Sequence, residues 1–217
     1  VGLPQLLPGG LGAGWYGVDT QQAPIDSASL HALLWRVQPD LVVEIGTWCG
    51  GSAIFLAKTA IGYNSRARVI TVDVHAAESR AKDACAGRTA HGVHGVVSSL
   101  WRSLQASGNL VPLVGDAVLT RSVYRRLEHE ASRASRVMII DDGDHISSTV
   151  KAHFRALSHL VTPSSYYVIE DSRLETECAH AVLTQRSPWS YCTELLRRGG
   201  PATALAELSR SSAFRSE

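Results

Sequence analysis

The stretch Leu41-Val-Val-Glu-Ile-Gly-Thr-Trp-Cys-Gly-Gly-Ser52 decides the fold of this chain. Its first five residues form a short, largely apolar run, which is typical of a strand buried on both faces of a parallel sheet. The glycines that follow allow a tight turn and let a ligand approach backbone N–H groups at a helix start. A strand, a glycine-rich turn and a helix in this order predict the first unit of an α/β fold.

Strand and helix patterns alternate on both sides of this unit. Further strands are expected at 69–73, 110–114, 136–141 and 166–170. Helices are expected at 26–37, 51–61, 118–132, 146–161, 173–185 and 201–209, with one or two more within 76–108, interrupted near 92–95. Asp26 is the expected cap of the first helix. This alternation implies right-handed βαβ units and a Rossmann-like, mainly parallel sheet flanked by helices. Residues 1–25 are expected to form an N-terminal arm or lid, and 26–217 a single domain.

Composition excludes several classes of protein. The 217 residues contain 21 Lys plus Arg and 20 Asp plus Glu, so no excess of cations supports nucleic-acid binding. No apolar run approaches the length of a membrane span. The four cysteines lack C-x-x-C spacing, which predicts reduced thiols in a cytoplasmic protein. The chain begins with Val1 and its single methionine is Met138, so we expect the natural protein to be longer.

Acidic residues follow the carboxyl ends of the expected strands, where sheets of this kind bind ligands. Glu44 lies beside the glycine turn, where it would repel a pyrophosphate but accept a hydrogen bond from an ammonium or hydroxyl group. The turn also lacks the G-x-G-x-x-G spacing of dinucleotide sites, so S-adenosylmethionine fits better than NAD. Asp73 is placed to hold ribose hydroxyls. The candidate cofactor-binding residues are Glu44, Gly46, Thr47, Gly50, Gly51, Ser52, Asp73, Asp116 and Asp141.

A second group of acids predicts a metal site. If the fourth and fifth strands are neighbours, Asp142, Glu170 and Asp171 converge, and three carboxylates repel one another unless a cation compensates them. Oxygen ligands favour Mg²⁺, Mn²⁺ or Ca²⁺ over zinc. His145 could take a proton from a metal-bound hydroxyl, which makes Asp142 and His145 the candidate catalytic residues. Alternatively, Asp141 and Asp142 cap the following helix and His145 lies in its first turn. The other histidines, including His153, are expected on helix surfaces.

The residues also resemble a known family. The stretch 16–57 is similar to the N-terminal region of the cephalosporin hydroxylase family, whose members are class I S-adenosylmethionine-dependent methyltransferases despite their name. Residues 139–146 and 168–171 resemble the metal motifs of that family and of the related macrolide sugar O-methyltransferases. The resemblance implies that Asp142, Glu170 and Asp171 hold Mg²⁺ (or Mn²⁺) and that His145 is the base. It also implies a small-molecule acceptor, namely a hydroxyl of a sugar or another natural product.

The chain departs from the family in two places. Gly115-Asp116 stands where members often have Gly-Ser-Ser, so Asp116 becomes the candidate adenine contact. The two strands that close the class I sheet cannot be identified after the fifth strand. A non-catalytic relative with a binding role therefore stays an alternative, as does an NAD-dependent oxidoreductase or epimerase on a similar sheet. A non-haem iron oxygenase is disfavoured because no two-His-one-carboxylate pattern is visible. Trp15 and Tyr16 could close over the cofactor, or pack on the core or on a second subunit of a homo-oligomer.

Overall fold

The strand Leu41–Ile45 (β3) lies at the centre of a five-stranded sheet in the computed structural model, which describes residues 14–89, 92–184 and 190–211. All five of its residues are buried, as a continuous apolar run predicts. The strand order is β7-β4-β3-β8-β9 and every pairing is parallel, which confirms the predicted sheet. The other strands are β4 (Arg68–Asp73), β7 (Leu110–Val114), β8 (Val137–Asp141) and β9 (Tyr167–Ile169).

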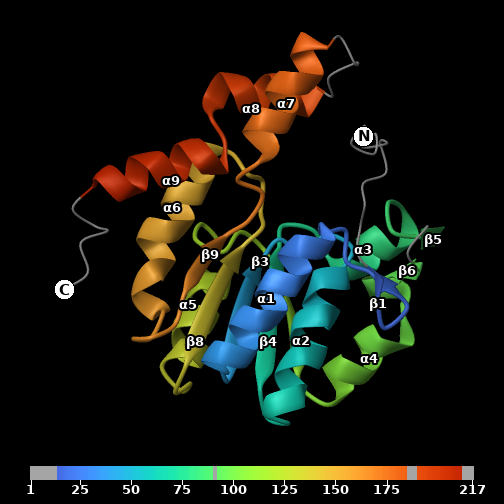
Figure 1. The fold of residues 1–217 in the computed structure, drawn as a ribbon. Coiled ribbons are helices and arrows are strands. Elements are labelled where there is room, and N and C mark those ends of the chain that lie inside the picture. The colour runs from blue at the N-terminus through green and yellow to red at the C-terminus, as the bar shows by residue number, and fades with distance from the viewer. Residues whose placement is uncertain (1–13, 90–91, 185–189, 212–217) are drawn as a thin grey trace.

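Helices cover both faces of this sheet because successive strand side chains point to opposite sides (Figure 1). On one face, Val42 belongs to the same core cluster as Leu34 and Phe55. On the other, Val43 belongs to a cluster with Leu127. The first face is covered by α1 (Pro24–Val37), α2 (Gly51–Tyr63) and α4 (Ser99–Ala106), and the second by α5 (Arg121–Ala131) and α6 (Ser147–Leu157).

The first helix starts earlier than predicted. Its N-cap is Ala23, and Pro24 is its first helical residue, where the missing N–H of proline costs no hydrogen bond. Asp26 therefore lies in the first turn and not at the cap. The prediction of Asp26 as the cap is wrong because the proline signal precedes it.

The order of the strands creates a cleft. The chain runs outward from β3 to β4 and β7, then returns to the other side of β3 to form β8 and β9. The loops after β3 and β8 consequently leave the sheet in opposite directions. Parallel sheets bind ligands at such a switch point, outside the carboxyl ends of their strands.

A second, smaller sheet was missed by the sequence patterns, because strands of two or three residues show no alternation. Its order is β1-β2-β6-β5, formed by β1 (Gly14–Trp15), β2 (Val18–Asp19), β5 (Arg88–Thr89) and β6 (Gly92–His94). The short helix α3 (Ala77–Lys82) precedes β5, and a 3₁₀ turn (Gly95–Val97) follows β6. The expected interruption near 92–95 is therefore β6 and the start of that turn.

The N-terminal segment lies against the core. The Trp15 ring is 5.0 Å from the Phe55 ring and stacks 6.2 Å from His31, so this tryptophan packs on α1 and α2. Tyr16 is exposed, with the Lys58 ammonium over its ring. Residues 1–13 of the expected arm lie outside the described residues. The division into an arm at 1–25 and a domain at 26–217 stays a prediction.

Among the described residues after β9, the regular elements are helices. The helices are α7 (Leu174–Leu183), α8 (Ser190–Arg198), which was not predicted, and α9 (Pro201–Arg210), which packs against α6 (Figure 1). A 3₁₀ turn (Ser158–Leu160) continues α6. None of the described residues after Ile169 belongs to a strand, and none of the described helices has the length and apolarity needed to cross a membrane.

The cysteines contradict the prediction of reduced thiols. Cys49 and Cys85 form a disulfide with 5.6 Å between their Cα atoms, and Cys178 and Cys192 form another with 5.1 Å. Both distances lie in the ordinary range for such bonds. The prediction is wrong because it used spacing along the chain, whereas the fold brings distant cysteines together.

Candidate active site

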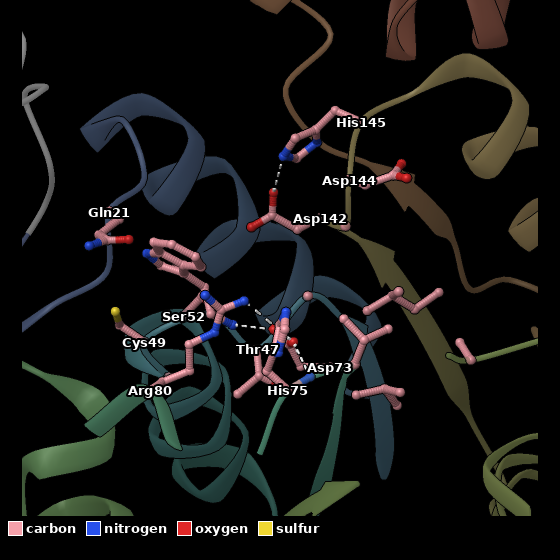
Figure 2. Close-up of a pocket in the computed structure, with 18 of the residues that line it drawn as sticks. Gln21, Thr47, Cys49, Ser52, Asp73, His75, Arg80, Asp142, Asp144 and His145 are labelled. Carbon is pink, nitrogen blue, oxygen red and sulfur yellow. Dashed lines mark hydrogen bonds and ion pairs between the residues drawn. The ribbon is translucent and has the colours of Figure 1, made fainter. Parts of the chain in front are cut away.

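A cavity of about 540 Å³ opens at the switch point, above the carboxyl ends of the strands (Figure 2). Most of the residues predicted from the sequence line it, and they come from the loops after all five strands of the large sheet. Those lining the cavity are Gly46, Thr47, Gly50, Gly51, Ser52, Asp73, Asp116, Asp142, His145 and Asp171. Glu44, Asp141 and Glu170 are absent from its wall.

The glycine loop between β3 and α2 forms one wall because its backbone can approach other segments closely. A Cβ atom on Gly46 would lie 2.0 Å from the carbonyl oxygen of Asp142, and one on Gly51 would lie 1.9 Å from that of Asp19. The first contact ties the loop to the turn after β8, and the second ties it to the small sheet. Glycine is therefore required at both positions.

Glu44 lies below this loop and does not face the cavity. Its side chain is buried, and Thr71 donates a hydrogen bond of 2.5 Å to its carboxylate. Burial raises the pKa of Glu44 to about 7, although hydrogen bonds from Ser52 and Thr71 oppose the shift. Glu44 is not among the residues that line the cavity, and its contact with the cofactor stays a prediction.

Asp73 stands at the end of β4 with its carboxylate fixed at the cavity wall. One oxygen accepts a hydrogen bond from the backbone N–H of Trp48, at 2.9 Å, and the other accepts one from His75, at 2.8 Å. These bonds hold the carboxylate still, as a ribose contact requires. Asp116 also lines the cavity, and one of its oxygens accepts from the backbone of Val118 and Leu119.

Sequence reasoning missed Arg80, which reaches the same wall from α3. Its guanidinium carbon lies 4.3 Å from the centre of the Trp48 ring, and its Nη2 lies 3.8 Å from Asp73 (Figure 2). No motif marked this arginine. Gln21, from the N-terminal segment, also lines the cavity.

Asp142, His145 and Asp171 form the part of the site that could hold a metal ion. Each offers one ligand atom, and these atoms lie within 4.8 Å of one another. The Nε2 atom of His145 is 3.5 Å from the Asp171 carboxylate and 4.0 Å from that of Asp142. Desolvation raises the pKa of Asp142 well above its usual range, and the charges of Glu170 and Asp171 add to the shift.

The backbone at this cluster is strained. His145 and Asp171 have φ angles of 59° and 55°, in the left-handed region that non-glycine residues seldom adopt. Trp48, on the opposite wall, has a φ of 44°. Residues held in this conformation cost about 1–3 kcal/mol each and gather at functional sites.

Glu170 is placed differently from its predicted partners. It lines a neighbouring pocket of about 230 Å³ between α1 and β9, together with Asp26 and Arg173. Its Oε1 atom is buried and has no hydrogen-bond partner among the described residues. Burial, followed by the charge of Asp171, raises the pKa of Glu170 to about 7. His145 therefore occupies the third position in the cluster, which was predicted for Glu170.

Asp141 points to the opposite face of the sheet from Asp142, because neighbouring side chains alternate along a strand. Its carboxylate accepts a hydrogen bond from the Tyr167 hydroxyl, at 3.1 Å, and lies 3.2 Å from the Nδ1 of His153. The structure thus uses Asp141 to join β8 to α6 and β9, and does not bring it to the predicted cofactor site. His153 is buried, so its expected place on a helix surface is wrong.

The close approach of Gly46 leads to a test of how the two loops are joined. Gly46→Ala is expected to lower the free energy of unfolding by at least about 2 kcal/mol, because the methyl group overlaps the Asp142 carbonyl and φ is +102°. Urea unfolding measures the loss. Gly17→Ala is the control, since Gly17 has a φ of +74° but nothing within 4 Å of the added methyl. Equal losses would show that the contact with Asp142 contributes nothing.

Comparison with known proteins places the chain in a family. The model of the family described as rhamnosyl O-methyltransferase/CmcI matches residues 12–211. The chain is 25% identical over 201 residues to the rhamnosyl O-methyltransferase of Mycobacterium leprae (strain TN), covering 92% of this chain and 77% of that enzyme.

Solved structures share the fold. The O-methyltransferase TomG from Streptomyces achromogenes, involved in tomaymycin synthesis and in complex with S-adenosylmethionine, has a TM-score of 0.56 at 19% identity, covering 89% of this chain and 72% of that one. The structure described as cmcI-D160 Mg-SAM has a TM-score of 0.50 at 19% identity, covering 84% of this chain and 65% of that one. The family model spans nearly all of the sequence, so the chain belongs to the rhamnosyl O-methyltransferase/CmcI family.

Proposed function

We propose that this protein transfers a methyl group from S-adenosylmethionine to a hydroxyl group of a sugar or another small natural product, with the help of a divalent metal ion. The observation that carries the proposal is the single cavity that joins the glycine loop and Asp73 to the cluster of Asp142, His145 and Asp171. Donor and acceptor could meet in it. The sugar acceptor is supported by the mycobacterial relative, which is named for rhamnosyl O-methylation.

The cofactor end of the cavity suits S-adenosylmethionine. The loop at Gly50 and Gly51 opens α2 without a side-chain cap, so its N-terminal N–H groups remain for a ligand. The Asp73 carboxylate, held by two backbone N–H groups, is available to ribose hydroxyls. When bound, the cofactor supplies the electrophilic methyl group.

The acidic end fits a divalent metal ion. Asp142 and Asp171 present carboxylate oxygens within 4.8 Å of each other. Burial first, and then the charges of Glu170 and Asp171, raise the pKa of Asp142, and a cation would compensate those charges. We propose Glu170 as a further oxygen donor, because its charge acts on Asp142 and its buried Oε1 has no hydrogen-bond partner among the described residues. Such a donor set favours Mg²⁺ or Mn²⁺, which when bound would lower the pKa of a coordinated hydroxyl.

His145 has the position of a general base. Its Nε2 faces the two carboxylates, and imidazole accepts protons near neutral pH. We propose that His145 removes the proton of the acceptor hydroxyl while Asp142 and Asp171 orient it. The walls of the cavity then hold the oxygen in line with the methyl group, and such positioning can account for much of the acceleration.

Titration calorimetry tests this proposal against its alternatives. We expect the protein to bind S-adenosylhomocysteine. We also expect it to bind Mg²⁺ when no NAD is present. Binding of NAD alone would contradict the proposal and favour an oxidoreductase. Binding of neither S-adenosylhomocysteine nor NAD would favour a non-catalytic relative. A transfer assay with a rhamnosyl acceptor, with and without EDTA, then tests the metal requirement.

A further inference from the structure

A disulfide links the glycine loop between β3 and α2 to the segment that carries Arg80. Cys49 lies within the loop, next to Trp48, and lines the cavity. Its partner, Cys85, follows α3 by three residues and is fully buried. The backbone N–H of Cys85 donates a hydrogen bond of 2.8 Å to the carbonyl oxygen of Arg80. The disulfide thus anchors the backbone of the residue that reaches Asp73.

The segment that follows Ala77, which is buried in the core at the start of α3, has little other buried surface. Between residues 78 and 89, all of which the structure describes, Cys85 is the one buried residue. The helix α3 spans six residues, too few for stability in isolation. Segments with little buried surface open most readily, so the disulfide carries a large share of the local order.

The Arg80 side chain has donors that the protein leaves unused. Its Nε is buried without a hydrogen-bond partner among the described residues, and its Nη2 is 3.8 Å from the Asp73 carboxylate, beyond hydrogen-bond reach. The guanidinium carbon lies 4.3 Å from the centre of the Trp48 ring, and the group faces Asp73 at the cavity wall (Figure 2). A guanidinium held in this way offers its N–H groups to a ligand that also contacts Asp73.

We propose that Arg80 is a cofactor-binding residue, and that the Cys49–Cys85 disulfide holds it in place, so that cofactor affinity depends on the oxidation state of this cysteine pair. This inference rests on the proposed binding of S-adenosylmethionine in the cavity. Arg80 donates to the ribose of the cofactor, beside Asp73. A dithiol supplies two electrons and two protons that break the S–S bond and form two thiols, while the dithiol becomes a cyclic disulfide. The freed segment then no longer holds Arg80 against Trp48.

The second disulfide is a matched control. Cys178–Cys192 joins α7 to α8 and packs with Ile146 and Leu195, and neither of its cysteines lines the cavity. Reducing conditions open both bonds, whereas paired serine substitutions open one at a time. The effect on the cofactor site can therefore be separated from a general loss of covalent links.

The test is calorimetric titration of S-adenosylhomocysteine into the oxidised full chain and its variants, at a temperature where circular dichroism shows each to be folded. Cys49→Ser with Cys85→Ser is expected to weaken binding about ten-fold, the value of one to two lost hydrogen bonds, and Arg80→Met about as much. Cys178→Ser with Cys192→Ser, and Arg125→Met on the exposed face of α5, should leave the affinity within two-fold.

Combining the substitutions separates a specific role from a merely structural one. The triple variant combines Cys49→Ser, Cys85→Ser and Arg80→Met. If the disulfide acts through Arg80, this variant binds S-adenosylhomocysteine about ten-fold more weakly than the wild type, because the second change removes nothing further. If the affinity of the triple variant falls about a hundred-fold, the two effects multiply and the proposal is overturned. Tight binding of S-adenosylhomocysteine by the Cys49/Cys85 variant would also overturn it. If the oxidised wild-type protein fails to bind S-adenosylhomocysteine, the proposed function itself fails, and this inference fails with it.

Discussion

Asp142→Ala is expected to lower kcat about a thousand-fold or more while leaving the affinity for S-adenosylhomocysteine within a few-fold. The reason is that Asp142 belongs to the cluster with His145 and Asp171 and not to the glycine loop, although both line one cavity. A bound divalent ion stabilises the developing charge by several kcal/mol, and each 1.36 kcal/mol is a factor of ten in rate. Steady-state assays in Mg²⁺ measure the first quantity, and calorimetry measures the second.

Asp142→Asn is the control for this variant, because it keeps the volume of the side chain and removes its charge. It should be as inactive as the alanine variant and should bind Mg²⁺ at least ten-fold more weakly. Two results would contradict the assigned role. One is turnover that still depends on Mg²⁺, and the other is an equal loss of turnover and of S-adenosylhomocysteine affinity.

His145→Gln is expected to lower kcat about 10²- to 10⁴-fold with little change in KM, because glutamine fills the space but does not accept the proton. The His145 ring lies 3.5 Å from Asp171, within the cluster that would orient the acceptor. Measurement of kcat and KM for methyl transfer at saturating Mg²⁺ gives the result. A base that acts on bound acceptor affects the rate more than the binding.

His75→Gln serves as the comparison, since His75 is an exposed histidine on the rim of the same cavity. Its turnover should stay within a few-fold of the wild type. If His145→Gln weakens Mg²⁺ binding as strongly as Asp142→Asn does, then His145 is a metal ligand and another group removes the proton.

Much of the fold follows from patterns that are visible in the sequence. The five strands of the large sheet were predicted within one or two residues, because continuous apolar runs fit buried parallel strands. Leu110–Val114 formed despite its proline, at the edge of the sheet, where a missing N–H is tolerated. The acids after the strands were predicted to face a common cleft, and ten of the thirteen candidate residues line one cavity.

The remaining features depended on contacts between distant segments. Nothing local marks Val18 and Val93 as partners in the small sheet, or Cys49 and Cys85 as a disulfide. The orientation of Asp141, by contrast, follows from a local rule. Side chains alternate along a strand, so Asp141 is expected to point to the opposite face of the sheet from Asp142. Glu170 continues the β9 pattern on the side of α1, which explains its place in the neighbouring pocket.

The pairing of β2 with β6 has a consequence for how the protein folds. Val18 and Asp19 reach Val93 and His94 across a long stretch of chain that includes the whole of β3, α2 and β4. Closing a loop of this length costs entropy, and a pairing of two residues in each strand makes few contacts to offset that cost, so we expect it to form late in folding. Because the backbone of Asp19 abuts Gly51, the glycine loop gains its final wall when this pairing forms. Ligand-binding competence should therefore be one of the last properties that the refolding chain acquires.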